Sequence, residues 1–359
     1  MESAVRLSPF VKFDPYNFVP VTRTPWAGAL IGACKKRALP KPEHGWPARI
    51  GESWEVSTDA HFPSKVVGDD VFLNQLIERN PAFYLGPGLS AIFGSHCPLL
   101  LKWLNAQEPL SVQVHPQHDH PLLKPNECGK PESWLILDNP HQAGFVFLGF
   151  KDGLSKDQIL AGLRQDRPRD VLHVVYPKVG DVIAIPPGCV HATGPGVLIA
   201  EPQYVLPAKS GKTWRLSDWR RFYNQAGEQD PLGKPRELHI DEAISAIDWD
   251  LPRGKELERL LIHNAAHREV FQANRYNPFP VQSFLTAGMY VYSPLVEEQF
   301  SLVTCWEGQL RLMHDSGETL SLVAGESGFI SAGAGIIRIE LSAVDAQFAP
   351  ACAFFAFKM

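Results

Sequence analysis

Apolar and polar residues alternate along much of this chain, as they do in β-strands with one buried face. In residues 110–115 the apolar side chains fall on one face, and Ser111, Gln113 and His115 fall on the other. Pro116 then ends the run, because proline cannot donate a ladder hydrogen bond. This segment therefore predicts a strand that presents polar groups to one side.

Many comparable runs, separated by turns, predict a chain built mainly from strands. Before residue 210 they lie at 54–57, 98–104, 132–137, 143–150, 180–186 and 197–201. A second series follows at 289–292, 300–306, 309–313, 319–323, 328–331, 336–341 and 352–357. The 31 prolines and 28 glycines are spread along the chain, as expected for many short strands joined by turns.

Three segments have the apolar spacing of helices instead. Residues 69–80 begin with two aspartates that can cap a helix, and they stop before a proline. Residues 155–175 contain a second helix, in which Ser155 and Gln158 have the spacing of a capping box. Residues 240–248 predict a short connecting helix.

The length of 359 residues exceeds what one compact core usually holds. We expect residues 1–235 to form a first, metal-binding domain, with the helical insertion near 155–175. Residues 236–270 are expected to be a helical connector, and residues 271–359 a second β-domain. The second series of strands contains a single histidine, His314, so we expect no second metal site there.

Composition narrows the possible partners and the compartment. The formal net charge of -5 argues against nucleic acid or an anionic membrane as the main partner. The N-terminal residues lack the apolar core of a signal peptide, and no run reaches the roughly 18 apolar residues of a membrane-spanning helix. The six cysteines are scattered without a C-x-x-C pair, which favours reduced thiols. We therefore expect a cytoplasmic protein.

Three short stretches carry the chemistry. They are Gln113–Pro116, Lys130–Glu132 and Gly188–His191, and each adjoins a predicted strand. Together they supply two imidazoles, one carboxylate and one amide, a complete ligand set for one divalent metal. The predicted ligands are Gln113, His115, Glu132 and His191.

Structural roles compete with this interpretation. A lone histidine after a turn is more often structural than a ligand, so only the joint pattern favours His191 as a ligand. Arg215 could pair with Asp218 or lie over a tryptophan, Lys130 could be a solvated loop residue, and Glu201 could merely close a strand. For five further residues we favour roles away from the metal: His118, His120, His141, Cys128 and Cys189.

Residues 180–191 have the spacing G-x5-P-x-G-x2-H, which resembles the second signature of the cupin barrel. The first signature of that fold is normally H-x-H followed by a glutamate. Here Gln113 replaces the first histidine, and Glu132 lies well downstream. Pro195 stands where an asparagine is often found.

The Gln-x-His-Pro and Lys-Pro-Glu stretches resemble those of type I mannose-6-phosphate isomerases. Further segments resemble motifs of the same family in the same order along residues 20–250. They are Pro25–Gly28, Gly51–Ser57, Ser111–Pro116, Thr213–Trp219 and Arg236–Ile240. The resemblance implies a mainly β fold of cupin (jelly-roll) barrels with a few helices packed outside.

The same resemblance implies one Zn²⁺ per chain, held by the four predicted ligands. It also implies that Arg215 is the active-site arginine, that Lys130 belongs to the pocket, and that Glu201 lies on the strand before the arginine. The segment between Glu201 and Arg215 is a few residues longer than the family pattern, which suggests a different substrate loop.

The implied activity interconverts mannose 6-phosphate and fructose 6-phosphate by moving a proton between C1 and C2 through an enediolate. The zinc would act as a Lewis acid, Arg215 would stabilise the negative charge, and Glu201 or Lys130 would carry the proton. The phosphate of the hexose phosphate needs a cationic contact. The candidates are Lys209 and Lys212 of the loop before Arg215, or Lys130 with Ser111.

Two other functions compete with the isomerase. An iron-dependent dioxygenase of the cupin superfamily usually has more histidine ligands, so Gln113 argues against it. A non-catalytic relative that binds sugar phosphates would keep the metal without turnover, and the presence of Arg215 and Lys130 argues against that. The sequence carries no signal for the oligomeric state.

Overall fold

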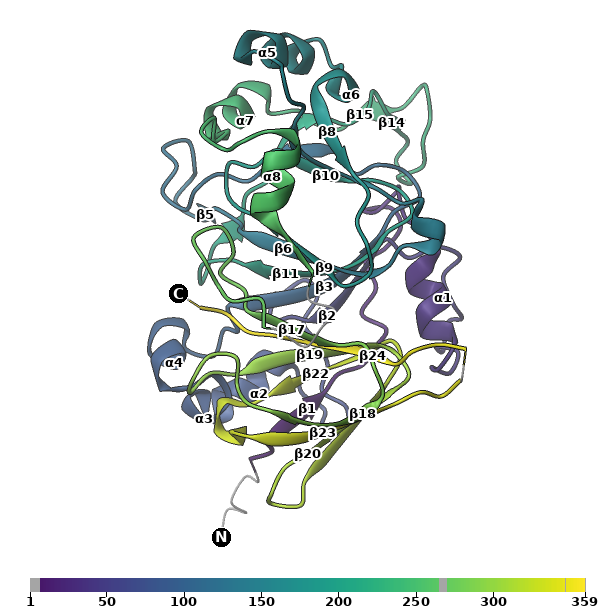
Figure 1. Cartoon of the computed structure of the whole chain (residues 1–359), viewed down its shortest axis with the longest axis vertical. Helices are drawn as coiled ribbons and strands as arrows, with labels where there is room; N and C mark the ends of the chain where they lie inside the picture. The colour runs from purple at the N-terminus through teal and green to yellow at the C-terminus, as the bar shows by residue number, and fades with distance from the viewer. Residues whose placement is uncertain (1–6, 265–269, 346, 359) are drawn as a thin grey trace.

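The computed structural model describes residues 7–264, 270–345 and 347–358. Its main sheets stack one above another along the longest axis, with most of the helices at the outside (Figure 1). The upper half, in teal and green, holds residues of the first predicted domain. The lower half is mainly yellow-green and holds the C-terminal strands.

Two sheets build the upper half. One has six strands in the order β16-β9-β6-β11-β3-β2, and the other has five in the order β13-β4-β10-β7-β8. The first comprises β2 (Glu52–Val56), β3 (Leu99–Asn105), β6 (Glu132–Asp138), β9 (Asp181–Ile185), β11 (Leu198–Tyr204) and β16 (Ile262–Asn264). The second comprises β4 (Val112–Val114), β7 (Val146–Phe150), β8 (Leu172–Val175), β10 (His191–Thr193) and β13 (Trp214–Ser217).

Strand alternation decides which side chains enter the space between these two sheets. On β4, Val112 and Val114 point outward into an apolar cluster that includes residues of α5 and α7. Gln113 therefore points to the opposite, inner face. On β6, Trp134 and Ile136 belong to the inner cluster, which places Glu132 on that same inner face.

The helices are short and lie mostly at the outside. Those of the upper half are α1 (Leu30–Lys36), α5 (Lys156–Arg164), α6 (Pro168–Val171), α7 (Ile240–Ala246) and α8 (Gly254–Leu261). Beside the lower half lie α2 (Leu73–Arg79), α3 (Pro81–Leu85) and α4 (Pro87–Phe93). Two single turns of 3-10 helix lie at Pro140–Gln142 and Ala332–Ala334.

Two further sheets build the lower half, with strand orders β1-β22-β19-β24-β17 and β18-β23-β20-β21. Their strands are β1 (Phe10–Lys12), β17 (Val281–Phe284), β18 (Gly288–Tyr292), β19 (Ser301–Glu307), β20 (Gln309–Met313), β21 (Thr319–Val323), β22 (Glu326–Ile330), β23 (Ile337–Ser342) and β24 (Ala351–Phe355). The space between the two sheets is filled by apolar side chains, such as Leu310, Ile339 and Phe354.

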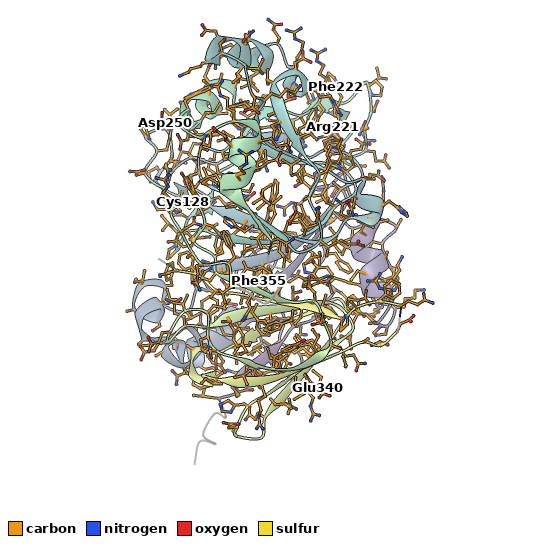
Figure 2. The ribbon with its side chains drawn as sticks, viewed as in Figure 1. Cys128, Arg221, Phe222, Asp250, Glu340 and Phe355 are labelled. Atoms are coloured by element: carbon orange, nitrogen blue, oxygen red, sulfur yellow. The ribbon has the colours of Figure 1, made fainter. Side chains whose placement is uncertain are left out.

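Two pairs of two-residue strands complete the sheets of the described residues. β5 (Glu127–Cys128) pairs with β12 (Ser210–Gly211), and β14 (Phe222–Tyr223) pairs with β15 (Lys234–Pro235). Arg221 and Phe222 mark this second pair at the upper right of Figure 2. The first pair ties the loop before Glu132 to the loop before Arg215, so it brings two predicted site segments together.

The two halves share a continuous apolar layer. Leu101 and Trp103 of β3 contribute to it from above, and Phe329 of β22 and Phe355 of β24 contribute from below. Figure 2 shows Phe355 at the level where the two halves meet. β1 pairs with β22, so residues near the start of the chain complete a sheet of the C-terminal strands. The predicted division at residues 235 and 270 stays a prediction.

Most predicted elements appear within a few residues of their expected bounds. The predicted cap of the first helix is wrong: α2 begins at Leu73 rather than beside Asp69 or Asp70, and the side chain of Gln75 accepts a hydrogen bond from the Phe72 N–H instead. Within the described residues, no helix has both the length and the apolar character that crossing a bilayer requires. All six cysteines are buried free thiols.

Candidate metal centre

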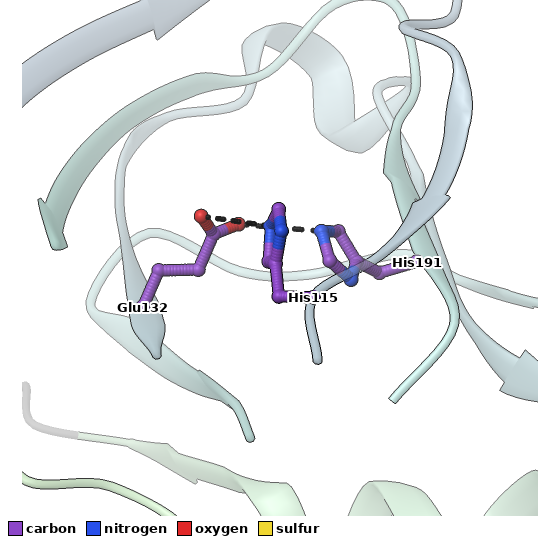
Figure 3. Close-up of side chains that lie close together, drawn as sticks. All are labelled: His115, Glu132 and His191. Atoms are coloured by element: carbon purple, nitrogen blue, oxygen red, sulfur yellow. Dashed lines mark ion pairs between the residues drawn. The ribbon is translucent and has the colours of Figure 1, made fainter. Parts of the chain in front are cut away.

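Three of the predicted ligands converge between the two upper sheets. His115 follows β4 directly, Glu132 begins β6 and His191 begins β10. Figure 3 shows their side chains pointing toward one another. The Nε2 atoms of His115 and His191 lie 3.2 and 3.3 Å from the two carboxylate oxygens of Glu132. All three residues are at most 1% exposed.

The hydrogen bonds of the two imidazoles leave their inner nitrogens available. The Nδ1 of His115 lies 3.0 Å from the Lys212 carbonyl, and the Nδ1 of His191 lies 2.9 Å from the Cys189 carbonyl. A carbonyl can only accept, so each Nδ1 carries the proton and each Nε2 presents a lone pair. Both Nε2 atoms and the Oε1 of Glu132 are buried without a hydrogen-bond partner among the described residues.

Such orphaned buried atoms are costly unless something binds them. Two imidazole nitrogens and a carboxylate are ligands that a divalent cation such as Zn²⁺ accepts. Backbone acceptors on the outer nitrogens are also usual at metal sites, where they fix the tautomer. The residues present therefore fit a metal ion. In the part of the chain that the structure describes, no other group of three His, Cys, Asp or Glu side chains converges in this way.

A glycine turn connects the two histidines. Gly188 has a φ of +86°, which disfavours other residues, and its N–H donates to the His115 carbonyl over 2.8 Å. The Cys189 N–H donates to the Pro186 carbonyl and closes the turn. The turn thus places the start of β10 beside the end of β4, which explains why the G-x5-P-x-G-x2-H spacing accompanies this geometry.

Burial keeps the His115 imidazole ready to bind a cation. Burial, helped by the charge of Lys130, lowers the pKa of His115 to about 4, so the ring is neutral at pH 7. Although burial opposes ionisation of Glu132, the charge of Lys130 holds the pKa of this carboxyl well below its usual range. The cluster therefore combines a neutral imidazole at His115 with a negative carboxylate at Glu132.

Gln113 and Arg215 flank this cluster through strand register. Gln113 of β4 lies directly opposite His191 of β10 on one side and opposite Arg215 of β13 on the other. Residues directly opposite in an antiparallel pair project from the same face. The three side chains therefore enter the same space, although the loop before Arg215 is longer than expected.

Arg215 does not pair with Asp218, the structural alternative considered from the sequence. Asp218 instead binds Arg221, with Nη2 to Oδ1 at 2.7 Å, and Arg236, with Nε to Oδ2 at 2.8 Å. The Nη1 of Arg215 donates to the Glu237 carbonyl over 2.8 Å, and its buried Nε has no partner among the described residues. The guanidinium thus keeps donor capacity for a ligand.

Glu201 of β11 is buried beside the cluster. Its Oε1 accepts from the Trp134 indole N–H over 3.1 Å, and its Oε2 accepts from the Gln203 amide. The same amide donates to Glu132 over 3.2 Å, so Gln203 links the two carboxylates. Burial, and then the negative charge of Glu132, raise the pKa of Glu201 to about 8. A carboxyl with this pKa can both hold and release a proton near neutrality.

Lys130 is held at the site by Glu132, with its Nζ 3.0 Å from Oε2. Although burial opposes the charge, Glu132 and Glu201 hold the pKa of Lys130 above its usual value. Sequence reasoning missed a second lysine, Lys102 of β3, whose Nζ lies 4.4 Å from the centre of the Trp54 ring. A single charge inside the apolar run 98–104 was the signal that could have identified it.

A cavity of about 340 Å³ opens beside the metal cluster. The side chains of Gln113, Lys130, Glu201 and Arg215 all line it. A neighbouring cavity of about 380 Å³ shares Lys130 and adds Lys209, so the two form adjoining spaces. The space suits a small polar molecule bound beside the metal cluster.

The predicted bystanders lie around this cavity in other roles. The ring of His118 packs edge-on against Tyr204, and the ring of His120 packs edge-on against Trp214. Cys128 and Cys189 are buried, and burial raises the pKa of both thiols. Neither cysteine joins the converging ligand group. His141 lies in a surface turn with a φ of +57°.

The sequence is similar in part to those of known mannose-6-phosphate isomerases. The family model of the phosphomannose isomerase type I catalytic domain matches residues 26–132. The mannose-6-phosphate isomerase ManA of Bacillus subtilis is 31% identical over 205 residues, and the mannose-6-phosphate isomerase of Streptococcus mutans is 30% identical over a stretch of the same length. Over part of its length, the chain is therefore similar to type I phosphomannose isomerases. Each of these alignments covers 56% of this chain and 59% of the relative's own length.

Solved structures extend the likeness in fold to nearly the whole chain. The mannose 6-phosphate isomerase of Bacillus subtilis superposes with a TM-score of 0.72 over 97% of this chain and 99% of that one, at 21% identity. A mannose 6-phosphate isomerase solved with zinc and yttrium gives a TM-score of 0.65 over 98% of this chain and 100% of that one, at 16% identity. The predicted mainly β cupin architecture is confirmed by these likenesses.

Proposed function

We propose that this chain is a type I phosphomannose isomerase and that it interconverts mannose 6-phosphate and fructose 6-phosphate with one Zn²⁺ per chain. The observation that supports the proposal most is the group of buried ligand atoms of His115, Glu132 and His191 that have no hydrogen-bond partner among the described residues. The residues beside them, Gln113, Lys130 and Glu201, line a polar cavity. Gln113 is proposed as the fourth ligand, because its register places it beside His191. When bound, the zinc supplies Lewis-acid stabilisation of negative charge on the substrate oxygens.

The reaction removes a proton from C2 of the aldose and returns a proton to C1, while a second proton moves from the C2 oxygen to the C1 oxygen. Glu201 is proposed to carry the carbon-bound proton, because its raised pKa of about 8 suits both steps near neutrality. Lys130 is the alternative carrier, although its ion pair with Glu132 favours the charged form.

Arg215 is proposed to stabilise the enediolate. Its guanidinium stays charged at every working pH, and its Nε has no partner among the described residues. Arg215 lies on β13, directly opposite Gln113 of β4. From there it can donate a hydrogen bond to a substrate oxygen as negative charge develops on that oxygen. In this proposal the metal binds on the His191 side of Gln113, and the Arg215 guanidinium lies on the other side.

The two alternative functions make different demands on this site. An oxygenase needs open metal positions for oxygen and usually more imidazole ligands than the two present here. A non-catalytic relative needs no proton carrier, whereas Glu201 is kept protonatable within the cavity. Both observations favour the isomerase.

Metal content and a coupled assay for fructose 6-phosphate formation, both measured on wild type and on H191A, test the proposal. We expect wild type to hold zinc and turn over mannose 6-phosphate, and H191A to lose at least about tenfold in zinc affinity. H314A is the matched control, because His314 lies in the lower half, outside the converging ligand group, and its replacement should leave both readings unchanged. Iron with oxygen uptake would support the oxygenase, and metal without turnover of any hexose phosphate would support the binding relative.

Two further predictions belong to the proposal. The division into residues 1–235, 236–270 and 271–359 is supported by the separate apolar filling of the two lower sheets. A cytoplasmic location is supported by the six buried free thiols, and cell fractionation tests it.

A further inference from the structure

We call the cavity of about 340 Å³ beside the ligand cluster the metal cavity. The cations that line it differ in whether a neighbouring carboxylate neutralises their charge. They are Arg23, Lys102, Lys130, Arg215 and Arg236. A cation that already has a carboxylate partner offers less to an incoming phosphate than an unpaired one. The pairing of each therefore indicates which could bind the phosphate of a hexose phosphate.

Three of these cations have an acidic neighbour. Arg236 is the most firmly held, because two of its nitrogens contact Asp218. The nitrogen–oxygen distances are 3.0 Å for Lys130 and Glu132, 2.8 Å for Arg236 and Asp218, and 3.8 Å for Lys102 and Glu52. The two arginines Arg23 and Arg215 remain.

Arg215 belongs to the reacting end of the cavity, because it lies opposite Gln113 in the ladder. In a hexose 6-phosphate the phosphate lies at the opposite end of the carbon chain from C1 and C2. A substrate that presents C1 and C2 to the metal and Arg215 therefore needs its phosphate contact elsewhere. Within residues 7–264, 270–345 and 347–358, Arg23 forms no ion pair with a carboxylate.

Arg23 lies where three cavities meet. It lines the metal cavity, the adjoining cavity of about 380 Å³ and an outer cavity of about 720 Å³ beside β14 and β15. Its guanidinium packs over the Phe62 ring, with the Cζ atom 5.1 Å from the ring centre. Phe62 in turn packs against Trp54, whose side chain lines the metal cavity. The guanidinium is thus supported on one face while its N–H groups lie at its edge.

The backbone beside Arg23 is fixed. The Arg23 N–H donates to the Pro20 carbonyl, and the Ala27 N–H donates to the Thr24 carbonyl, each over 2.9 Å. Thr24 and Trp26 are 1% and 4% exposed. A charged side chain on such an anchored turn loses less conformational freedom on binding than one on a loose loop.

We propose that Arg23 binds the phosphate group of the substrate and thereby selects phosphorylated over free hexoses. This inference rests on the proposed isomerase function for the identity of the sugar phosphate. A planar guanidinium can donate two parallel hydrogen bonds to phosphate oxygens, which gives both affinity and orientation. With the phosphate on Arg23, C1 and C2 can reach the metal cluster through the shared cavity.

The lysines considered from the sequence are less suitable. The Nζ of Lys212 is 2.8 Å from Glu127, so a carboxylate already neutralises it. Lys209 lines only the adjoining cavity and does not reach the metal cavity. Lys209 thus offers a matched control, because it is a nearby cation at the same group of cavities.

The test compares R23Q, R23K and K209Q with wild type. It measures the fructose 6-phosphate formed from mannose 6-phosphate and, in a separate assay, the fructose formed from free mannose. We expect R23Q to raise KM for mannose 6-phosphate roughly 10- to 100-fold, the range for a lost charged hydrogen bond, with kcat nearly unchanged. We expect free mannose to be turned over slowly, and at the same rate by R23Q and wild type. R23K should recover part of the loss, and K209Q should behave as wild type.

Three results would overturn the proposal: an unchanged KM in R23Q, a raised KM in K209Q alone, or an equal loss for mannose and mannose 6-phosphate. Calorimetric binding of mannose 6-phosphate and of inorganic phosphate separates this proposal from the isomerase itself. If wild type binds mannose 6-phosphate without turnover, weaker binding by R23Q supports the role of Arg23 although the isomerase proposal fails. If wild type does not bind it, or R23Q binds it equally, the role of Arg23 is refuted.

Discussion

Replacing Lys35 with methionine should destabilise the contact between the two halves of the molecule. Lys35 of α1 is fully buried, and its Nζ lies 2.7 Å from Glu55 of β2. The same ammonium donates to the carbonyls of Pro15 and Gly325, over 2.9 and 2.8 Å. Gly325 lies in the turn between β21 and β22, so one charge joins an upper sheet to the turn between two lower strands.

The size of the destabilisation follows from the Glu55 carboxylate, which K35M leaves buried without its cation. Methionine keeps most of the packing volume but leaves the buried Glu55 carboxylate without its cation. Among the described residues, only the Ser327 hydroxyl still donates a hydrogen bond to it, over 2.9 Å. Removing one partner of a buried ion pair typically costs about 3–5 kcal/mol. We expect a loss in this range in the free energy of unfolding, measured by guanidinium titration with tryptophan fluorescence.

Two variants control for other causes. K36M changes an exposed lysine on the same helix and should stay within about 0.5 kcal/mol of wild type. The double variant K35M/E55Q removes the stranded charge, so it should recover at least about 1.5 kcal/mol of the loss. A cost below about 1 kcal/mol for K35M, or no recovery in the double variant, would refute the account of a buried ionic contact.

Three further predictions concern the site and its supports. E201Q should retain zinc but lose at least about 100-fold in kcat in the isomerase assay, because the amide cannot carry the proton; a kcat within threefold of wild type would remove Glu201 from the mechanism. D218N should destabilise the fold, since burial opposes the charge of Asp218 but hydrogen bonds from Arg236 and Arg221 still hold its pKa below the usual value. That stabilisation is present above about pH 4 and is lost as the pH falls through the folded pKa of Asp218. The difference between wild type and D218N in the free energy of chemical unfolding should therefore shrink in acid. A difference that stays constant with pH would contradict this. G188A should cost roughly 1–3 kcal/mol and lower zinc retention, because a Cβ there would lie 2.6 Å from the Asp248 Cβ at a φ of +86°; unchanged thermal stability would contradict the strained turn.

Alternation in the sequence predicted the strands that carry the candidate ligands. The polar face of residues 110–115 lies inward as expected, because the valines of β4 fill the outer apolar cluster. The glycine turn before His191 was visible as well, since its spacing reflects a backbone that needs a positive φ. These features are local, so a sequence can reveal them.

Contacts between distant segments were not predictable in the same way. The pairing of β1 with β22 joins residues more than 300 positions apart, and β1 is only three residues long. The link that Gln203 makes between Glu132 and Glu201 was missed, although its place two residues after Glu201 puts both on one face. Arg23 lies in no recognisable sequence motif. It was identified from the structure, because it lines three adjoining cavities.

A metal held by Gln113, His115, Glu132 and His191 is proposed to support isomerisation of a hexose phosphate. Zinc titration into chelator-stripped protein, with fructose 6-phosphate formation from mannose 6-phosphate as the readout, tests it most directly. We expect the rate of fructose 6-phosphate formation to rise with added zinc and to reach a plateau at one zinc per chain. Full turnover by the stripped protein, or no turnover by the zinc-loaded protein, would contradict it.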